Sequence, residues 1–166
     1  MARSKSHVNL ALSRSHLHAI GLVAAHWNTL EIEVLYVMRQ LANVPFNIVL
    51  ALATPSNFAA WLDMLRRLTR ESKEHRWKEP QLKKICEKLK GLQTARNSVV
   101  HAAWQDTGQG AVKASTVAFG IGFPKRGLRV ALEIDKSAAE IRGIAKAIAA
   151  ADEELLDWWE QPPPKP

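Results

Sequence analysis

Apolar residues recur at three- and four-residue intervals along most of the chain, a pattern typical of helices with one buried face. The first such stripe predicts a long helix over residues 13–43, which Pro45 brings to an end. A short apolar helix is expected over 46–53. Thr54 and Pro55 are residue types that open helices, so we expect the third helix to begin there.

The second half of the chain changes from a helical to a two-residue period. A fourth helix is expected over 81–104 and ends at the turn residues 106–110. Residues 128–134 alternate cleanly between apolar and polar side chains, and 112–119 is a weaker run of the same kind. We therefore expect a β-hairpin over residues 111–135.

A last helix is expected after the hairpin. Ser137 and Glu140 have the spacing of a capping box at its start. The predicted fold is mainly α, an antiparallel bundle of four to five helices with a β-hairpin inserted before the last helix. We interpret residues 1–160 as a single domain with a loose arm over 1–12, followed by a proline-rich tail over 161–166.

Charge is unevenly distributed along the 166 residues, which carry a net charge of +7. Residues 66–90 contain ten Lys or Arg against four Glu, whereas 133–160 contain eight acidic residues against three basic ones. The basic block indicates a polyanionic partner such as nucleic acid, although a solvated lysine-rich helix has the same composition. The single cysteine, Cys86, fits a reducing compartment. With no signal peptide and no membrane span, we expect a cytoplasmic protein.

Several common chemistries lack their sequence patterns. The chain has no glycine-rich phosphate loop at a strand–helix junction and no nucleophile elbow. No helix carries the histidine and glutamate spacing of a zinc or di-iron site, so we expect no metal and no cofactor.

Arg96 interrupts an apolar face of the fourth predicted helix. A guanidinium at the centre of such a face costs several kcal/mol unless it is paired. The obvious partners are Glu31 and Glu33 on the first helix. We favour Glu31, because it lies on the edge of that helix nearest Trp27.

Asn97 and His101 lie on the opposite side of the same predicted helix. An ideal helix directs them about 140–180° away from the apolar face, toward solvent or a second subunit. His101 shares this side with Lys83, Lys90 and Trp104. Arg96 and His101 therefore do not share a face. Either Arg96 reaches across the rim of a cleft, or it anchors the helix while His101 carries more of the chemistry.

The segment Arg96-Asn97-Ser98-Val99-Val100-His101, with Trp104 three residues further on, resembles the R-N-x-x-x-H motif of HEPN-domain proteins. This family is helical, with the motif near the end of a late helix, and does not obviously include a hairpin. The resemblance implies a metal-independent endoribonuclease, such as a toxin with a cognate antitoxin or a phage-defence effector. It also implies a homodimer in which two motifs form one composite site.

The resemblance assigns roles to individual residues. His101 would transfer protons during attack of the RNA 2′-hydroxyl, because histidine titrates near neutral pH. Arg96 would hold phosphate oxygens, and Asn97 would bind substrate or orient His101. The expected products are a 2′,3′-cyclic phosphate and a 5′-hydroxyl. Glu31, Glu33 and Trp104 are expected to support the site, and the basic residues expected to bind RNA are Lys83, Lys84 and Lys90.

Two other functions remain open from the sequence. One is a non-catalytic module that binds RNA or nucleotide through the basic block. The other is a protein-interaction domain in which the polar face of the motif helix is only an interface. A DNA-binding helix-turn-helix is less favoured, because no pair of short helices presents a basic recognition helix.

Overall fold

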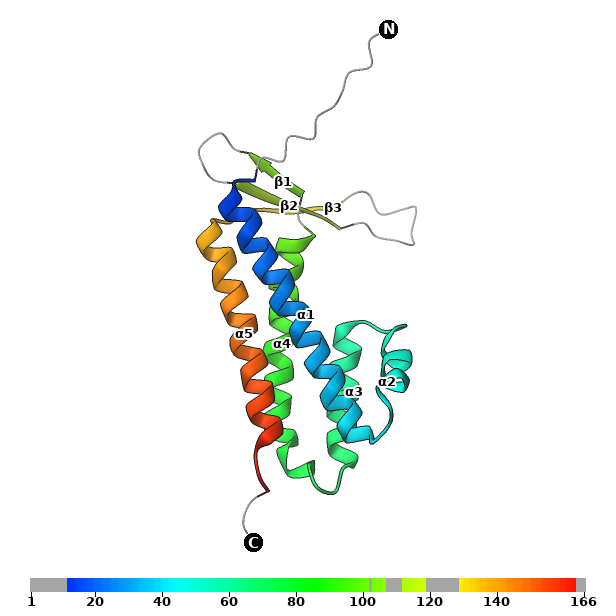
Figure 1. Cartoon of the computed structure of the whole chain (residues 1–166). Coiled ribbons are helices and arrows are strands. Elements are labelled where there is room, and N and C mark those ends of the chain that lie inside the picture. The colour runs from blue at the N-terminus through cyan, green and yellow to red at the C-terminus, as the bar shows by residue number, and fades with distance from the viewer. Residues whose placement is uncertain (1–11, 102, 107–111, 119–128, 164–166) are drawn as a thin grey trace.

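The computed structural model describes residues 12–101, 103–106, 112–118 and 129–163. Three long helices lie side by side, two shorter ones pack beside α1, and a small sheet lies at one end of the bundle (Figure 1). The elements in chain order are α1 (Arg14–Ala42), α2 (Phe46–Ala53), α3 (Phe58–Glu71), the 3₁₀ turn η1 (Arg76–Lys78), α4 (Glu79–Val100), β1 (Ala103–Asp106), β2 (Val112–Ala118), β3 (Arg129–Asp135) and α5 (Ala138–Glu160). The expected arm lies outside the described residues except for Leu12, and so do residues 164–166 of the tail.

The long first helix is confirmed, and both of its ends have local causes. The Ser13 hydroxyl accepts the backbone N–H of His16, which satisfies one of the unpaired donors of the first turn. At the other end Asn43 adopts a left-handed conformation with φ of 51° and donates its N–H to the last carbonyls. Pro45 follows and prevents further helix.

The start of the third helix differs from the sequence prediction. The Asn57 side chain caps α3 by accepting the N–H of Ala60 at 3.0 Å. Thr54 instead belongs to the end of α2, where its hydroxyl donates to the carbonyl of Leu50 at 2.7 Å. The expectation that Thr54 opens the third helix is therefore wrong, because its hydroxyl donates to a carbonyl of the preceding helix, α2.

The predicted start of α5 is confirmed. The Ser137 side chain accepts the N–H of Glu140, and the Glu140 carboxylate accepts the N–H of Ser137 at 2.6 Å. This reciprocal capping box fixes the first turn of the helix. It also lowers the pKa of Glu140, because the carboxylate form accepts hydrogen bonds from both the backbone and the hydroxyl of Ser137.

The insert before α5 is not the hairpin that we expected. The segment forms a three-stranded antiparallel sheet in the order β1-β2-β3, with a register shift between Ser115 and Thr116. The additional strand, β1, begins at Ala103 and Trp104, which we assigned to the end of the fourth helix, and ends at Asp106, which we placed in the turn. α4 ends at Val100, and pairing of β1 with β2 replaces the predicted last turn. Residues 111 and 119–128 of the predicted hairpin lie outside the described chain.

The core lies between α1, α4 and α5, with α3 closing one side. Its largest fully buried side chains are Trp158, Leu30, Met38, Leu62, Leu65, Leu82, Ile85, Leu89, Ile141, Ile148, Leu155 and Val23. Among the described residues, no single helix is both long and apolar enough to cross a membrane; α1 and α2 pass that test only together, across a 117° bend.

Candidate functional site

Three polar side chains converge where α4 ends. Nη1 of Arg96 lies 3.0 Å from Oδ1 of Asn97 and 2.8 Å from Nε2 of His101. Arg96 and Asn97 are half-buried, and His101 is exposed. All three residues of the predicted catalytic set therefore meet at a single guanidinium nitrogen.

The end of the helix makes this convergence possible. His101 is the first residue beyond α4, with φ of −101° and ψ of 10°, and its N–H still donates to the carbonyl of Asn97. Its ring is therefore not held to the direction that an ideal helix would give it. The expectation that Arg96 and His101 point apart is wrong, because it assumed a helix that continues to Trp104. Trp104 lies instead in β1.

The contact is a hydrogen bond in only one form of the His101 ring. A guanidinium only donates hydrogen bonds, so Nε2 of His101 must accept. The imidazole is consequently neutral, with its proton on Nδ1. A lone pair on Nε2 is the form that a general base requires.

Arg96 rests on an aromatic ring rather than on a carboxylate. Its Cζ lies 5.9 Å from the centre of the Trp27 ring, within the range of a cation–π contact. Trp27 is 2% exposed and packs against Phe58, with ring centroids 4.7 Å apart. The ring of Trp27 therefore forms a rigid support under the guanidinium.

Glu31 takes part in this site, but not as the partner that we expected. Its Oε1 accepts the indole N–H of Trp27 at 2.6 Å, and no ion pair between Arg96 and an acidic residue is present in the described part of the chain. Glu31 and Arg96 therefore both contact the indole of Trp27 rather than each other. A carboxylate on the indole N–H increases electron density in the ring and strengthens its attraction for a cation.

Glu33 lies on another face of α1. Its charge acts on Asp152 of α5, whose pKa is raised mainly by burial and further by Glu33. The structure therefore separates the two candidate glutamates and connects only Glu31 to Arg96. The residue that sequence reasoning missed is Trp27; its available signal was the four-residue spacing from Glu31, which places both on one helix face.

Arg96 still has donors without acceptors. Its Nε is buried and has no hydrogen-bond partner, and within the described residues Nη2 has none either. Nη1 already contacts Asn97 and His101, so Nε and Nη2 are the donors of Arg96 that have no acceptor among the described residues.

The basic residues predicted to bind RNA are not gathered at this site. Lys90 and Lys83 precede His101 by 11 and 18 residues, which at 1.5 Å per residue is about 16 Å and 27 Å along the helix axis. Lys90 is also paired with Asp63 at 2.9 Å. Lys83 and Lys84 are exposed and form no ion pair with any described residue.

Other sources of reactivity are weak in the described part of the chain. Cys86 is buried, and burial raises the pKa of its thiol to about 12, so it is not a nucleophile at neutral pH. No group of three or more His, Cys, Asp or Glu residues is placed to hold a metal ion there.

Comparison with protein-family models, with curated proteins and with solved structures finds no significant match to this chain.

Proposed function

We propose that this chain is a metal-independent endoribonuclease whose site is centred on Arg96, Asn97 and His101. The observation that carries the proposal is the contact of one guanidinium nitrogen with both Asn97 and the basic nitrogen of His101. The resemblance of the segment to the HEPN motif supports the same reaction. A neutral imidazole beside a permanent positive charge is suited to phosphoryl chemistry without a metal.

In the proposed reaction, His101 removes the proton from an RNA 2′-hydroxyl. The 2′-oxygen then attacks the adjacent phosphorus, and the bond from phosphorus to the 5′-oxygen breaks. Arg96 binds the non-bridging oxygens as negative charge develops on them. The substrate phosphate has to draw Nη1 away from Nε2 of His101, which frees the base for the proton transfer. The products are a 2′,3′-cyclic phosphate and a 5′-hydroxyl end.

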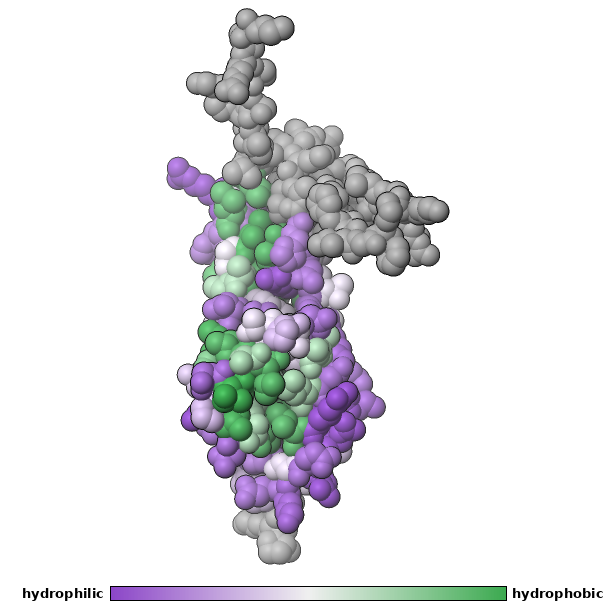
Figure 2. All heavy atoms as spheres, turned by 90° about the vertical axis from the view of Figure 1, so that its right-hand side faces the viewer, coloured by the Kyte–Doolittle hydropathy of each residue, from purple (hydrophilic) through white to green (hydrophobic). Residues whose placement is uncertain are grey.

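The leaving 5′-oxygen needs a proton, and each copy of the described site contains one histidine. We propose that His101 of a second copy supplies this proton in a homodimer. That ring acts as the imidazolium ion, without the contact to Arg96, while His101 of the first copy keeps the proton taken from the 2′-hydroxyl. The dimer has a candidate surface: on the side where α2 lies, apolar side chains gather in a patch bordered by polar ones (Figure 2). The large exposed apolar residues of α2 are Ile48, Leu50 and Leu52, which are 45%, 46% and 56% exposed. On α1, Tyr36 is 46% exposed and stacks on Phe46 of α2, and Ile32 is 40% exposed. Exposed apolar clusters of this kind are typical of interaction sites.

Cleavage of mixed RNA in buffer containing EDTA tests the proposal. We expect wild-type protein to degrade the RNA and His101→Ala to lose about 10²-fold or more in rate. His18→Ala is the matched control, because His18 is another exposed histidine with no hydrogen bond in the described structure, and it should retain full activity. Intact RNA with wild-type protein, or equal cleavage by wild type and His101→Ala, would refute the proposal. RNA binding without cleavage would favour the non-catalytic module.

A further inference from the structure

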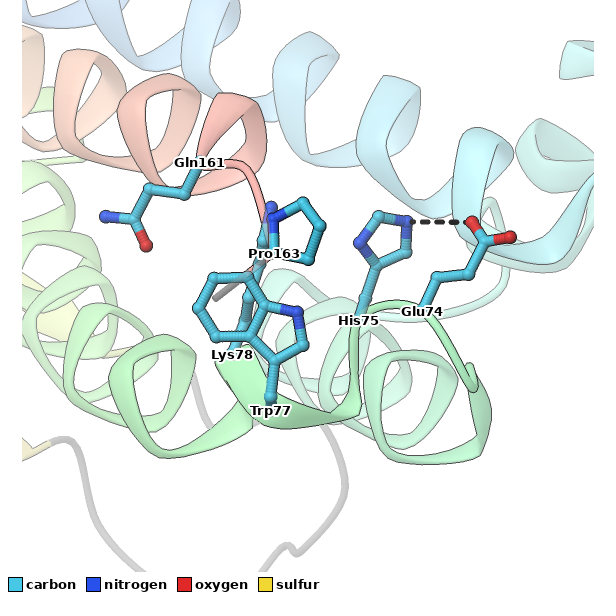
Figure 3. A pocket seen from close by; sticks show the side chains of 6 residues that line it. All are labelled: Glu74, His75, Trp77, Lys78, Gln161 and Pro163. Atoms are coloured by element: carbon cyan, nitrogen blue, oxygen red, sulfur yellow. Dashed lines mark ion pairs between the residues drawn. The ribbon is translucent and has the colours of Figure 1, made fainter. Parts of the chain in front are cut away.

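A second polar cluster lies at the opposite end of α4. A cavity of about 230 Å³ opens between η1, the turn before it and the segment that follows α5 (Figure 3). The residues that line it are Glu74, His75, Trp77, Lys78, Gln161 and Pro163. Trp77 and Pro163 lie in front of Lys78 in this view, with His75 and Glu74 to one side.

Lys78 is 2% exposed, and aromatic rings surround its ammonium group. Nζ lies 5.4 Å from the ring centre of Trp77, 5.6 Å from that of Trp158 and 5.7 Å from that of Trp159. It donates one hydrogen bond to the carbonyl of Trp159 at 2.7 Å. In return, the indole N–H of Trp158 donates to the carbonyl of Lys78 at 3.1 Å. These contacts fasten the end of α5 to η1.

These contacts do not give the charge of Lys78 a counter-ion among the described residues. An ammonium group has three N–H donors, and only one has an acceptor among the described residues. No carboxylate in the described chain forms an ion pair with it. Burial of an unpaired cation is costly, and burial accordingly lowers the pKa of Lys78.

His75 presents a second unsatisfied nitrogen beside the same cavity. Its ring packs on Trp159 with centroids 4.9 Å apart, and its Nδ1 is buried without a hydrogen-bond partner. Its Nε2 is 4.0 Å from a carboxylate oxygen of Glu74, whose side chain is 88% exposed. Burial and the charge of Lys78 lower the pKa of His75, which favours the neutral ring. A neutral ring that carries its proton on Nδ1 can donate from that atom.

We propose that this cavity binds a small organic anion with a flat apolar body, such as an aromatic carboxylate. The carboxylate would accept from Nζ of Lys78 and Nδ1 of His75, which lack a negative partner. The ring would pack between Trp77, which is 40% exposed, and Pro163. The cavity is smaller than the usual range of drug-sized pockets, so it accommodates one ring rather than a dinucleotide.

Calorimetric titration of the full chain with benzoate tests this proposal, with neutral benzyl alcohol as the matched compound. We expect benzoate to bind with a dissociation constant of about 1 mM or tighter, and benzyl alcohol at least tenfold more weakly. Trp77→Ala, at a partly exposed position, should weaken benzoate at least tenfold, whereas Lys84→Met should leave it unchanged. Lys78→Met should make the two compounds bind equally.

If Lys78→Met does not fold, the proposal is still tested by the comparison of benzoate with benzyl alcohol and by Trp77→Ala. No saturable binding of benzoate, equal affinity for benzoate and benzyl alcohol, or benzoate binding that Trp77→Ala does not weaken would each overturn it. None of these measurements involves RNA, so the proposed nuclease activity and this binding site stand or fall separately.

Discussion

Nη1 of Arg96 donates to Nε2 of His101 across the end of α4, over 2.8 Å. This contact joins the permanent cation to the imidazole, and it is a hydrogen bond when Nε2 carries the lone pair. It depends on the early end of the helix at Val100, since a continuous helix would hold the two side chains apart. The same guanidinium nitrogen also binds Asn97. One nitrogen of Arg96 therefore holds both of the other residues of the candidate site.

Replacement of Arg96 by lysine tests whether this geometry matters beyond charge. Lysine retains the positive charge but not the planar fork that serves Asn97 and His101 together. We expect Arg96→Lys to reduce kcat for RNA cleavage by about 10²-fold or more. Arg67→Lys, at an exposed arginine of α3, is the control and should cleave normally. An Arg96→Lys enzyme of wild-type activity would show that only the charge is needed.

The Trp27–Glu31 pair should act on catalysis through Arg96. Trp27→Phe keeps the ring but removes the N–H that Glu31 accepts, and Glu31→Gln removes the charge. Since an exposed to partly buried cation–π contact is worth about 0.5–2 kcal/mol, we expect kcat to fall about 2- to 30-fold with little change in KM. Glu33→Gln is the matched control. Equal effects of the two glutamate substitutions, or none from either, would contradict this positioning role.

The apolar surface of α2 should hold the dimer together. Leu52 is 56% exposed, so Leu52→Asp places a charge in the proposed interface without disturbing the core. We expect light scattering to show a wild-type dimer and a folded Leu52→Asp monomer with much reduced RNA cleavage. Leu17→Asp is the control, because Leu17 is 49% exposed but lies near the other end of α1. A monomeric wild-type protein at high concentration would refute the interface.

Asp152 should make the fold less stable at neutral pH than in mild acid. Its Oδ1 is buried without a partner, and its pKa is raised by burial and by the charge of Glu33, with partial relief from His26. Because the folded state binds this proton more tightly, the contribution to stability is present below the unfolded pKa and is lost as pH rises through the folded pKa.

Asp152→Asn should therefore stabilise the protein at pH 7. We expect a gain of a few tenths of a kcal/mol to about 1 kcal/mol after allowance for solvent screening, or a rise in Tm of about 1–3 °C. The gain should shrink as the pH is lowered toward 4. Asp157→Asn, at an exposed position of the same helix, should have no such effect. Calorimetric unfolding that shows the same Tm for Asp152→Asn and wild type at pH 7 would contradict the prediction.

The sequence predicted those helix ends whose signal is local. Ser137 and Glu140 cap the helix that they were expected to cap, because the hydroxyl and the carboxylate meet backbone N–H groups within the same turn. The same reasoning failed at Thr54, whose hydroxyl donates to the carbonyl of Leu50 in α2 instead of capping the next helix. It failed again beyond Val100, where strand pairing between distant residues decided the structure.

The site shows the same division between local and long-range information. The anomaly of Arg96 on an apolar stripe predicted a partner on the first helix, and one was found there. The partner that we expected, Glu31, was wrong, since a helical projection shows which residues share a face but not how far each side chain reaches. Arg96 contacts the ring of Trp27, and the N–H of that ring already binds Glu31. Nothing in the sequence indicated that Lys78 is buried, because its hydrogen-bond partners, Trp158 and Trp159, are 80 and 81 positions away along the chain.

In the proposed reaction, Arg96 and His101 cleave RNA through its own 2′-hydroxyl. The most direct measurement uses an RNA oligonucleotide that the protein cuts at a mapped position and a copy with a single 2′-deoxy substitution there, both in EDTA. Mass spectrometry should detect a 2′,3′-cyclic phosphate from the unmodified strand and no cleavage at the substituted position. Cleavage at the substituted position, or a product ending in a 3′-hydroxyl, would contradict the account.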